Sequence, residues 1–179
     1  MTFSGFFAFQ VAGASAGAEL AYYDTYVNDS VAKILFAGFA ERMGTLQTSG
    51  NNLPANYTVK GICGMWGAMP AMPSGKELIS ASYRAYPTIL FKGGRDLGLP
   101  DGYGNFSGCP NYPRTISGTG IYNRLLALGV PSVYHFAPVA GHTAYDDVFC
   151  VNQAICFFNS LMNRKPYFGY YTYYNSSCR

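Results

Sequence analysis

Charged residues are scarce in this sequence: Lys, Arg, Asp and Glu together make up 12% of the 179 residues. The net charge of +3 at pH 7 is too small for the basic surface by which proteins bind nucleic acid. No block of acidic residues forms a tail. The composition therefore excludes nucleic acid as a partner. Hydrophobic residues account for 49% of the chain, which is enough to bury one sizeable core.

Long apolar runs are absent as well. No uninterrupted stretch reaches the roughly 18 to 20 residues needed to cross a bilayer, so no membrane span is predicted. Residues 1–5 carry no positive charge, and the apolar residues 6–12 run straight into the motif at 13–17, which favours a core strand over a signal peptide. Four N-x-S/T triplets nevertheless favour a secreted, glycosylated protein. They begin at Asn28, Asn56, Asn105 and Asn175.

Histidine and cysteine are few and scattered, which excludes the common metal sites. The two histidines do not form an H-E-x-x-H motif, and the five cysteines contain no C-x-x-C pair. We therefore predict no metal and no cofactor. Cys150 and Cys156 are six positions apart on one expected helix, too far along it to bridge each other. An odd number of cysteines leaves at least one thiol unpaired or intermolecular.

The most informative motif present is a G-x-S-x-G pentapeptide at residues 13–17. A strand-like apolar segment, 6–11, precedes it, and an Ala/Leu-rich segment compatible with a helix follows it. A serine between a strand and a helix needs a sharp turn, and Gly13 and Gly17 are expected to let the two elements approach closely. The turn would lift the Ser15 hydroxyl above the sheet edge, next to the free N–H groups of the helix N-terminus.

Beyond this motif, strand-like and helix-like segments alternate. Strands are predicted at 57–66, 87–92 and 132–137. Helices are predicted at 16–43, with a break near 28–30, at 116–128 and at 146–162. Asp29 or Ser30 would cap the helix after the break, and Gly129 would end the helix at 116–128.

Three connecting segments and the tail lack such a pattern. Residues 48–54 and 97–113 are rich in turn residues and predict loops, and a loop as long as 97–113 is more often functional than idle. The prolines in 67–74 argue against a regular element there. The Tyr-rich tail, 164–179, shows no period, and no structure is predicted for it.

Alternating strands and helices predict an α/β fold with a parallel sheet, in which active residues lie at the carboxyl ends of the strands. Ser15 follows the first strand, Asp96 the third and His142 the fourth, so we expect the three side chains to converge. Such a set suits acyl transfer. His142 would take the Ser15 proton as the oxygen attacks a carbonyl, and Asp96 would fix the imidazole tautomer. The N–H of Ala16 would donate to the oxyanion.

Each candidate also has a purely structural alternative. Ser15 could be an ordinary turn serine, Asp96 a loop-capping aspartate and His142 a surface histidine. Asp101 is the second choice for the acid. His135 lies inside a predicted strand and is expected to be a packed or solvated side chain.

Three segments resemble the α/β-hydrolase superfamily. Residues 13–17 resemble the G-x-S-A-G elbow of esterases and lipases, and 89–100 resemble their strand followed by H-G-x-x-D-x-x-V-P, with Lys92 in place of the usual His and Leu99 in place of Val. Gly141-His142 is similar to the family's G-H. The resemblance covers residues 6 to about 160. It implies a partial α/β-hydrolase fold, a mostly parallel sheet with crossover helices, and the same Ser, Asp and His as a triad.

One departure from this family concerns the strands that precede the serine strand. In the family, four further strands precede the serine strand, and a loop among them completes the oxyanion hole; nothing upstream of Phe6 corresponds to them. We therefore expect residues 1–163 to be a hydrolase-like catalytic region truncated at its N-terminus, followed by the tail 164–179. The outer edge of the first strand would need a partner or a missing segment to cover it.

Two classes of function remain open from the sequence. The first is a serine carboxylic-ester hydrolase acting on a small-molecule or polymer-linked ester, with a serine peptidase as an alternative within the same fold. The second is a non-catalytic or incomplete hydrolase-like fragment that needs a partner.

Overall fold

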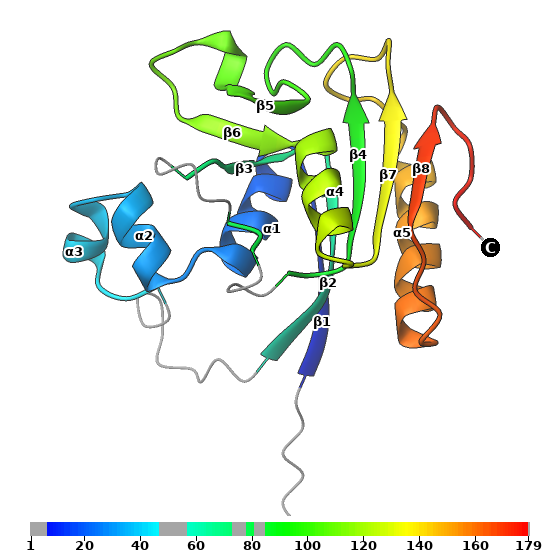
Figure 1. The fold of residues 1–179 in the computed structure, drawn as a ribbon, viewed down its shortest axis with the longest axis horizontal. Helices are drawn as coiled ribbons and strands as arrows, with labels where there is room; N and C mark the ends of the chain where they lie inside the picture. Colours follow the sequence, from blue (N-terminus) through cyan, green and yellow to red (C-terminus); the bar gives the residue numbers. More distant parts are fainter. Residues whose placement is uncertain (1–6, 47–56, 73–77, 81–84, 179) are drawn as a thin grey trace, which may run out of the picture.

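The computed structural model describes residues 7–46, 57–72, 78–80 and 85–178, and it shows an α/β fold with a mostly parallel sheet (Figure 1). The main sheet has five strands in the order β1-β2-β4-β7-β8, and every neighbouring pair is parallel. The predicted fold class is therefore confirmed. The predicted loop at 48–54 lies outside the described residues.

The elements have the following bounds. The main sheet contains β1 (Phe7–Ala14), β2 (Tyr57–Met65), β4 (Thr88–Gly93), β7 (Ser132–Ala137) and β8 (Gly169–Thr172). A smaller antiparallel sheet contains β3 (Ala68–Pro70), β6 (Arg114–Ser117) and β5 (Gly102–Asn105), and a 3₁₀ turn covers Phe106–Gly108. The helices are α1 (Ala16–Tyr26), α2 (Asp29–Leu35), α3 (Phe39–Met43), α4 (Gly118–Ala127) and α5 (Asp147–Met162).

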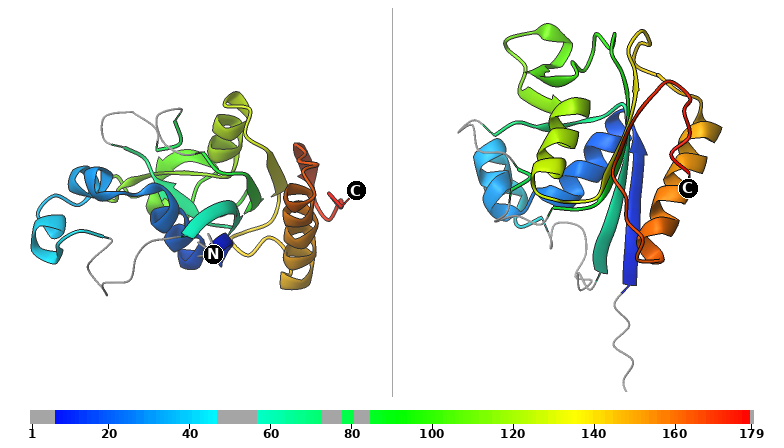
Figure 2. Two further views of the ribbon diagram at one scale, coloured as in Figure 1. Left: turned by 90° about the horizontal axis from the view of Figure 1, so that it is seen from below. Right: turned by 45° about the vertical axis from the view of Figure 1, so that its right-hand side comes forward.

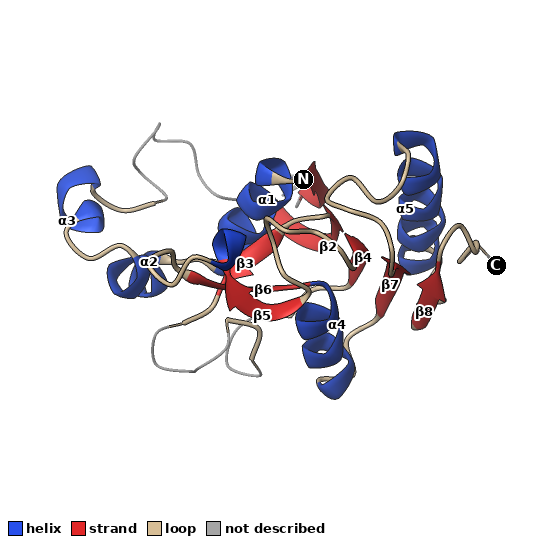
Figure 3. Cartoon of the chain, turned by 90° about the horizontal axis from the view of Figure 1, so that it is seen from above, coloured by secondary structure: helices blue, strands red, loops and turns tan. Residues whose placement is uncertain are grey.

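Helices cover both faces of the main sheet. α1 and α4 lie on one face and α5 lies on the other (Figures 2 and 3). The central strand β4 is buried along its whole length. Because side chains alternate along a strand, Leu90 packs with the cluster on the α1 and α4 side, and Ile89 and Phe91 pack with the cluster on the α5 side. This two-sided burial is typical of the parallel strands of α/β proteins.

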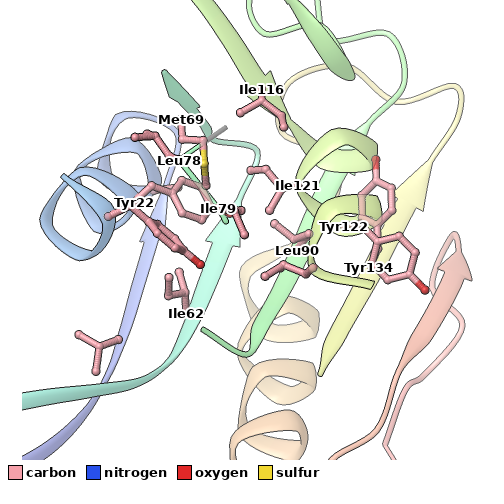
Figure 4. Close-up of a cluster of buried hydrophobic side chains, with 14 of the residues drawn as sticks. Tyr22, Ile62, Met69, Leu78, Ile79, Leu90, Ile116, Ile121, Tyr122 and Tyr134 are labelled. Carbon is pink, nitrogen blue, oxygen red and sulfur yellow. The ribbon is translucent and has the colours of Figure 1, made fainter. Parts of the chain in front are cut away.

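The core on the α1 and α4 side joins these helices to the sheet. Tyr22 of α1, Ile62 of β2 and Ile121 of α4 are each no more than 1% exposed and belong to one cluster of buried side chains (Figure 4). This cluster packs α1 and α4 against the sheet. No helix in the described residues is both long enough and apolar enough to cross a membrane.

Several local predictions were wrong. Asn28, not Asp29 or Ser30, caps α2, because its side chain accepts the Val31 N–H at 3.0 Å. Part of the proline-rich stretch 67–74 forms β3. The expected loop 97–113 contains β5 and the 3₁₀ turn. The helix predicted from residue 116 begins only at Gly118, because Arg114–Ser117 forms β6.

The tail adds the last strand of the main sheet. β8 pairs in parallel with β7 after the crossover through α5. A disulfide between Cys156 and Cys178 fixes the tail to α5, so Cys156 has a partner other than Cys150. The remaining three cysteines, Cys63, Cys109 and Cys150, are free thiols.

At the opposite edge of the sheet, β1 pairs with β2 alone within the described part of the chain. Its Phe9 is 49% exposed. The strand that precedes Ser15 is therefore an edge strand.

Candidate functional site

Ser15 occupies a strained turn between β1 and α1. Its φ of 52° and ψ of −122° are rare for a residue with a side chain. The Ser15 N–H still donates to the Met65 carbonyl at 2.9 Å, as if β1 continued, while its carbonyl already accepts from Ala18 and Glu19 at 3.0 and 3.1 Å. The strand and the helix thus meet at a single residue, which is the sharp turn expected from the sequence.

The two glycines of the motif contribute unequally to this turn. A Cβ on Gly13 would lie 2.2 Å from the carbonyl oxygen of Gly17, so only glycine lets β1 approach α1 this closely. A Cβ on Gly17 would meet nothing within 4 Å. The expectation that Gly17 also lacks a side chain for the sake of close packing was wrong.

The structure brings Ser15, His142 and Asp96 into one hydrogen-bonded chain. His142 Nε2 lies 2.8 Å from Ser15 Oγ, and His142 Nδ1 lies 2.8 Å from Asp96 Oδ2. The His142 side chain is 39% exposed, whereas that of Asp96 is fully buried. The imidazole therefore lies between the hydroxyl and the carboxylate and can be reached by solvent.

The loops after β4 and β7, which carry Asp96 and His142, are joined by backbone contacts. The Arg95 N–H donates to the Ala140 carbonyl at 2.9 Å. A Cβ on Gly93 would lie 1.9 Å from the Gly141 carbonyl oxygen. This close contact places the acid and the imidazole at the same end of the sheet.

Asp96 is held by four donors. Its Oδ1 accepts the backbone N–H groups of Gly98 at 2.9 Å and Leu99 at 3.1 Å. Its Oδ2 accepts from His142 and from the Lys92 ammonium, with which it forms a buried ion pair. Burial alone raises the pKa of Asp96, but the bonds from Lys92, His142 and Leu99 outweigh it and hold the pKa below its usual value.

Sequence reasoning did not assign a role to two charged neighbours of this chain. Lys92 is 1% exposed, and burial lowers its pKa although Asp96 acts in the opposite direction. Glu19 follows Ser15 by one helical turn; burial raises its pKa, and the field of His142 partly opposes this rise. The sequence signal for Lys92 was its replacement of the usual His before Gly93.

Asp101, the second choice for the acid, and His135, the other histidine, lie outside the hydrogen-bonded chain of Ser15, His142 and Asp96. Asp101 accepts from the Thr119 N–H at 2.7 Å and from the Tyr134 hydroxyl at 3.0 Å, at the start of α4. His135 is completely buried between the rings of Phe91 and Tyr171, with centroid distances of 5.0 and 5.2 Å. His135 is therefore a packed side chain.

The arrangement allows a proton transfer. Because the Asp96 carboxylate accepts the Nδ1 proton, the Nε2 lone pair of neutral His142 faces the Ser15 hydroxyl and can take its proton. The Ala16 and Gly17 N–H groups belong to the first turn of α1. N–H groups in the first turn of a helix have no acceptor within that helix, so they can donate to another group.

A cavity of about 750 Å³ is lined by Tyr23, Met69 and Arg124 among other residues, but not by the three side chains of the site. Comparisons with protein-family models, with curated proteins and with solved structures find no match to this chain.

Proposed function

We propose that this chain is a serine hydrolase of carboxylic esters, with Ser15 as the nucleophile, His142 as the general base and Asp96 as the acid that orients His142. The observation that carries the proposal is the continuous chain of two 2.8 Å contacts from the serine oxygen through the imidazole to the carboxylate. Both distances lie within the range of the hydrogen bonds that such catalysis needs.

The reaction follows from these contacts. As Ser15 Oγ attacks the ester carbonyl, its proton passes to His142 Nε2, and the carbonyl oxygen becomes a tetrahedral oxyanion. The Ala16 N–H donates to that oxyanion. The imidazolium then protonates the alkoxy oxygen of the ester, its bond to the carbonyl carbon breaks, and the alcohol leaves an acyl-serine. A water molecule gives a proton to the same imidazole as it attacks the acyl carbon, and the acid is released when the bond to Ser15 Oγ breaks and that oxygen takes the proton back.

The resemblance to the α/β-hydrolase superfamily supports this proposal. The order Ser, Asp, His and the strand-to-helix turn at the serine both belong to that family. Among the described residues, the Ala16 N–H is the oxyanion donor of this mechanism, and the loss of one donor from such a hole typically lowers the rate by roughly 10²–10³. We therefore expect slow hydrolysis of small-molecule or polymer-linked esters. A serine peptidase would use the same three residues.

Hydrolysis of p-nitrophenyl acetate and labelling by a fluorophosphonate probe test the proposal. The Ser15→Ala variant is expected to lose the labelling and to reduce hydrolysis to the background rate. Ser30→Ala, which changes an exposed serine in α2, is the matched control and is expected to behave like the unaltered chain. Labelling of Ser15→Ala at the unaltered rate would refute the role of Ser15.

The other class of function is a non-catalytic fragment that needs a partner. The observation that favours it is the edge position of β1, which pairs with β2 alone among the strands of the described residues. A folded chain that shows neither labelling nor hydrolysis above the Ser15→Ala background would favour this second candidate over the first.

A further inference from the structure

One oxygen of Asp96 serves two partners. The buried Lys92 ammonium forms its ion pair with Oδ2, and the same oxygen accepts from His142 Nδ1 at 2.8 Å. The other oxygen is already occupied by the N–H groups of Gly98 and Leu99. Lys92 is therefore part of the hydrogen-bonded chain through Asp96, and it has no hydrogen bond to Ser15 or His142 among the described residues.

The net charge of Lys92, Asp96 and His142 together depends on whether His142 is protonated. When the imidazole is neutral, the ammonium of Lys92 and the carboxylate of Asp96 balance. Without Lys92, the same state would contain a fully buried carboxylate with no opposite charge, which is costly in a protein interior. The proposed mechanism begins from the neutral imidazole. In that state the Lys92 cation balances the charge of the Asp96 carboxylate.

We infer that Lys92 is a positioning residue of the site, because its buried cation shares an Asp96 oxygen with His142 and balances the carboxylate charge in the state from which His142 accepts the serine proton. This inference rests on the proposed function and adds a fourth residue to it. Lys92 acts through Asp96 and is not itself a catalytic residue.

Other charged or titratable groups face this chain from neighbouring elements. Glu19 of α1 interacts electrostatically with His142. Asp101 acts on Lys92 and favours its charged form, and the Tyr134 hydroxyl from β7 donates to Asp101. Because Glu19 and Lys92 oppose each other at the imidazole, their removal is expected to shift its titration in opposite directions.

The Lys92→Met variant tests the inference. In this variant, no cation balances the buried charge of Asp96. When the pair of Asp96 and His142 loses its titrating proton, from either residue, an unbalanced negative charge is left in the interior. The titration midpoint of the His142 ring is therefore expected to rise by about one to two pH units. Lys92→Gln removes the same charge but keeps a donor, and it is expected to shift the midpoint in the same direction.

Proton NMR of the full chain measures this midpoint directly. With two histidines in the sequence, the ring signal that disappears in His142→Gln identifies His142. Glu19→Gln is expected to lower the midpoint. Lys60→Met, which removes an exposed lysine from β2, is the matched control and is expected to leave it unchanged. This measurement does not require hydrolysis, so it separates failure of the inference from failure of the proposed function.

Labelling by the fluorophosphonate probe as a function of pH provides the second measurement. In Lys92→Met the acidic limb of the labelling profile is expected to move upward together with the NMR midpoint. A midpoint in both folded Lys92 variants that equals that of the unaltered chain would overturn the inference.

A double variant keeps the inference testable if the single Lys92 variants do not fold. If neither Lys92→Met nor Lys92→Gln folds, the double variant Lys92→Met/Asp96→Asn removes both charges of the buried pair. Recovery of folding in the double variant would support charge balance by Lys92. Failure of the double variant to fold would show that the lysine acts by packing, and this result would also overturn the inference.

Discussion

His135 makes the stability of this protein depend on pH. The ring is fully buried between aromatic side chains, and its Nδ1 has no hydrogen-bond partner among the described residues. A proton on this ring would place a charge in an apolar environment, so burial lowers the pKa of His135 to about 4 from 6.5. The unfolded chain therefore binds more protons than the folded chain between pH 4 and 6.5.

The sign and size of the effect follow from this difference. The contribution is complete above pH 6.5 and is lost as the pH falls through about 4. Between pH 7.5 and pH 4.5, linkage predicts a loss of about 2.5 kcal/mol from the free energy of unfolding. That loss is a large share of the stability of a typical domain.

Urea unfolding of His135→Phe at the two pH values tests this prediction. The variant keeps an aromatic ring but cannot be protonated, so its pH dependence is expected to be smaller than that of the unaltered chain by about 2.5 kcal/mol. Ser177→Ala is the control, since it removes the hydroxyl 3.2 Å from His135 Nε2 and leaves the ring able to titrate. It is expected to lose about 1 kcal/mol at both pH values. Equal pH dependence in His135→Phe and the unaltered chain would refute the reasoning.

Two further predictions concern the turn and the tail. Gly13→Ala would place a Cβ 2.2 Å from the Gly17 carbonyl oxygen, so it is expected to destabilise the chain by about 2 kcal/mol or more and to slow probe labelling. Gly17→Ala meets open space and is expected to be neutral or stabilising by up to about 1 kcal/mol; a comparable loss in both variants would contradict this account. The Cys156→Ser/Cys178→Ser variant opens a link that spans 22 positions and is expected to lose about 3 kcal/mol in thermal unfolding. An unchanged melting temperature would show that the tail is held by its other contacts.

The position of the site was predictable from a local motif at Ser15 and from the shared direction of parallel strands. Gly13 lies near the end of the strand and Ser15 joins it to the helix within a few residues, so the local sequence contains the whole turn. Asp96 and His142 are distant in sequence, but the carboxyl ends of parallel strands meet at one rim, which is why the strand pattern alone brought them together. Their catalytic roles stay predictions.

Other features depend on contacts that no local pattern contains. The ion pair of Lys92 depends on which way a strand residue points and on how deeply it is buried. The three strands of the small sheet are three or four residues long, too short to show a period, and one of them contains Pro70. Asn28, Asp29 and Ser30 are all good helix caps, so propensity could not choose among them.

The bond between Cys156 and Cys178 has a practical consequence for producing this protein. Such a bond forms and persists where thiols are oxidised, as in the bacterial periplasm or the endoplasmic reticulum, and it is rare in a reducing cytosol. Material made under reducing conditions would leave residues 157–177 without their covalent anchor, and the tail would be held only by non-covalent contacts, such as the pairing of β8 with β7 and the hydrogen bonds between Gln153 and Ser177. Oxidative expression is accordingly the appropriate starting point for any assay of this chain.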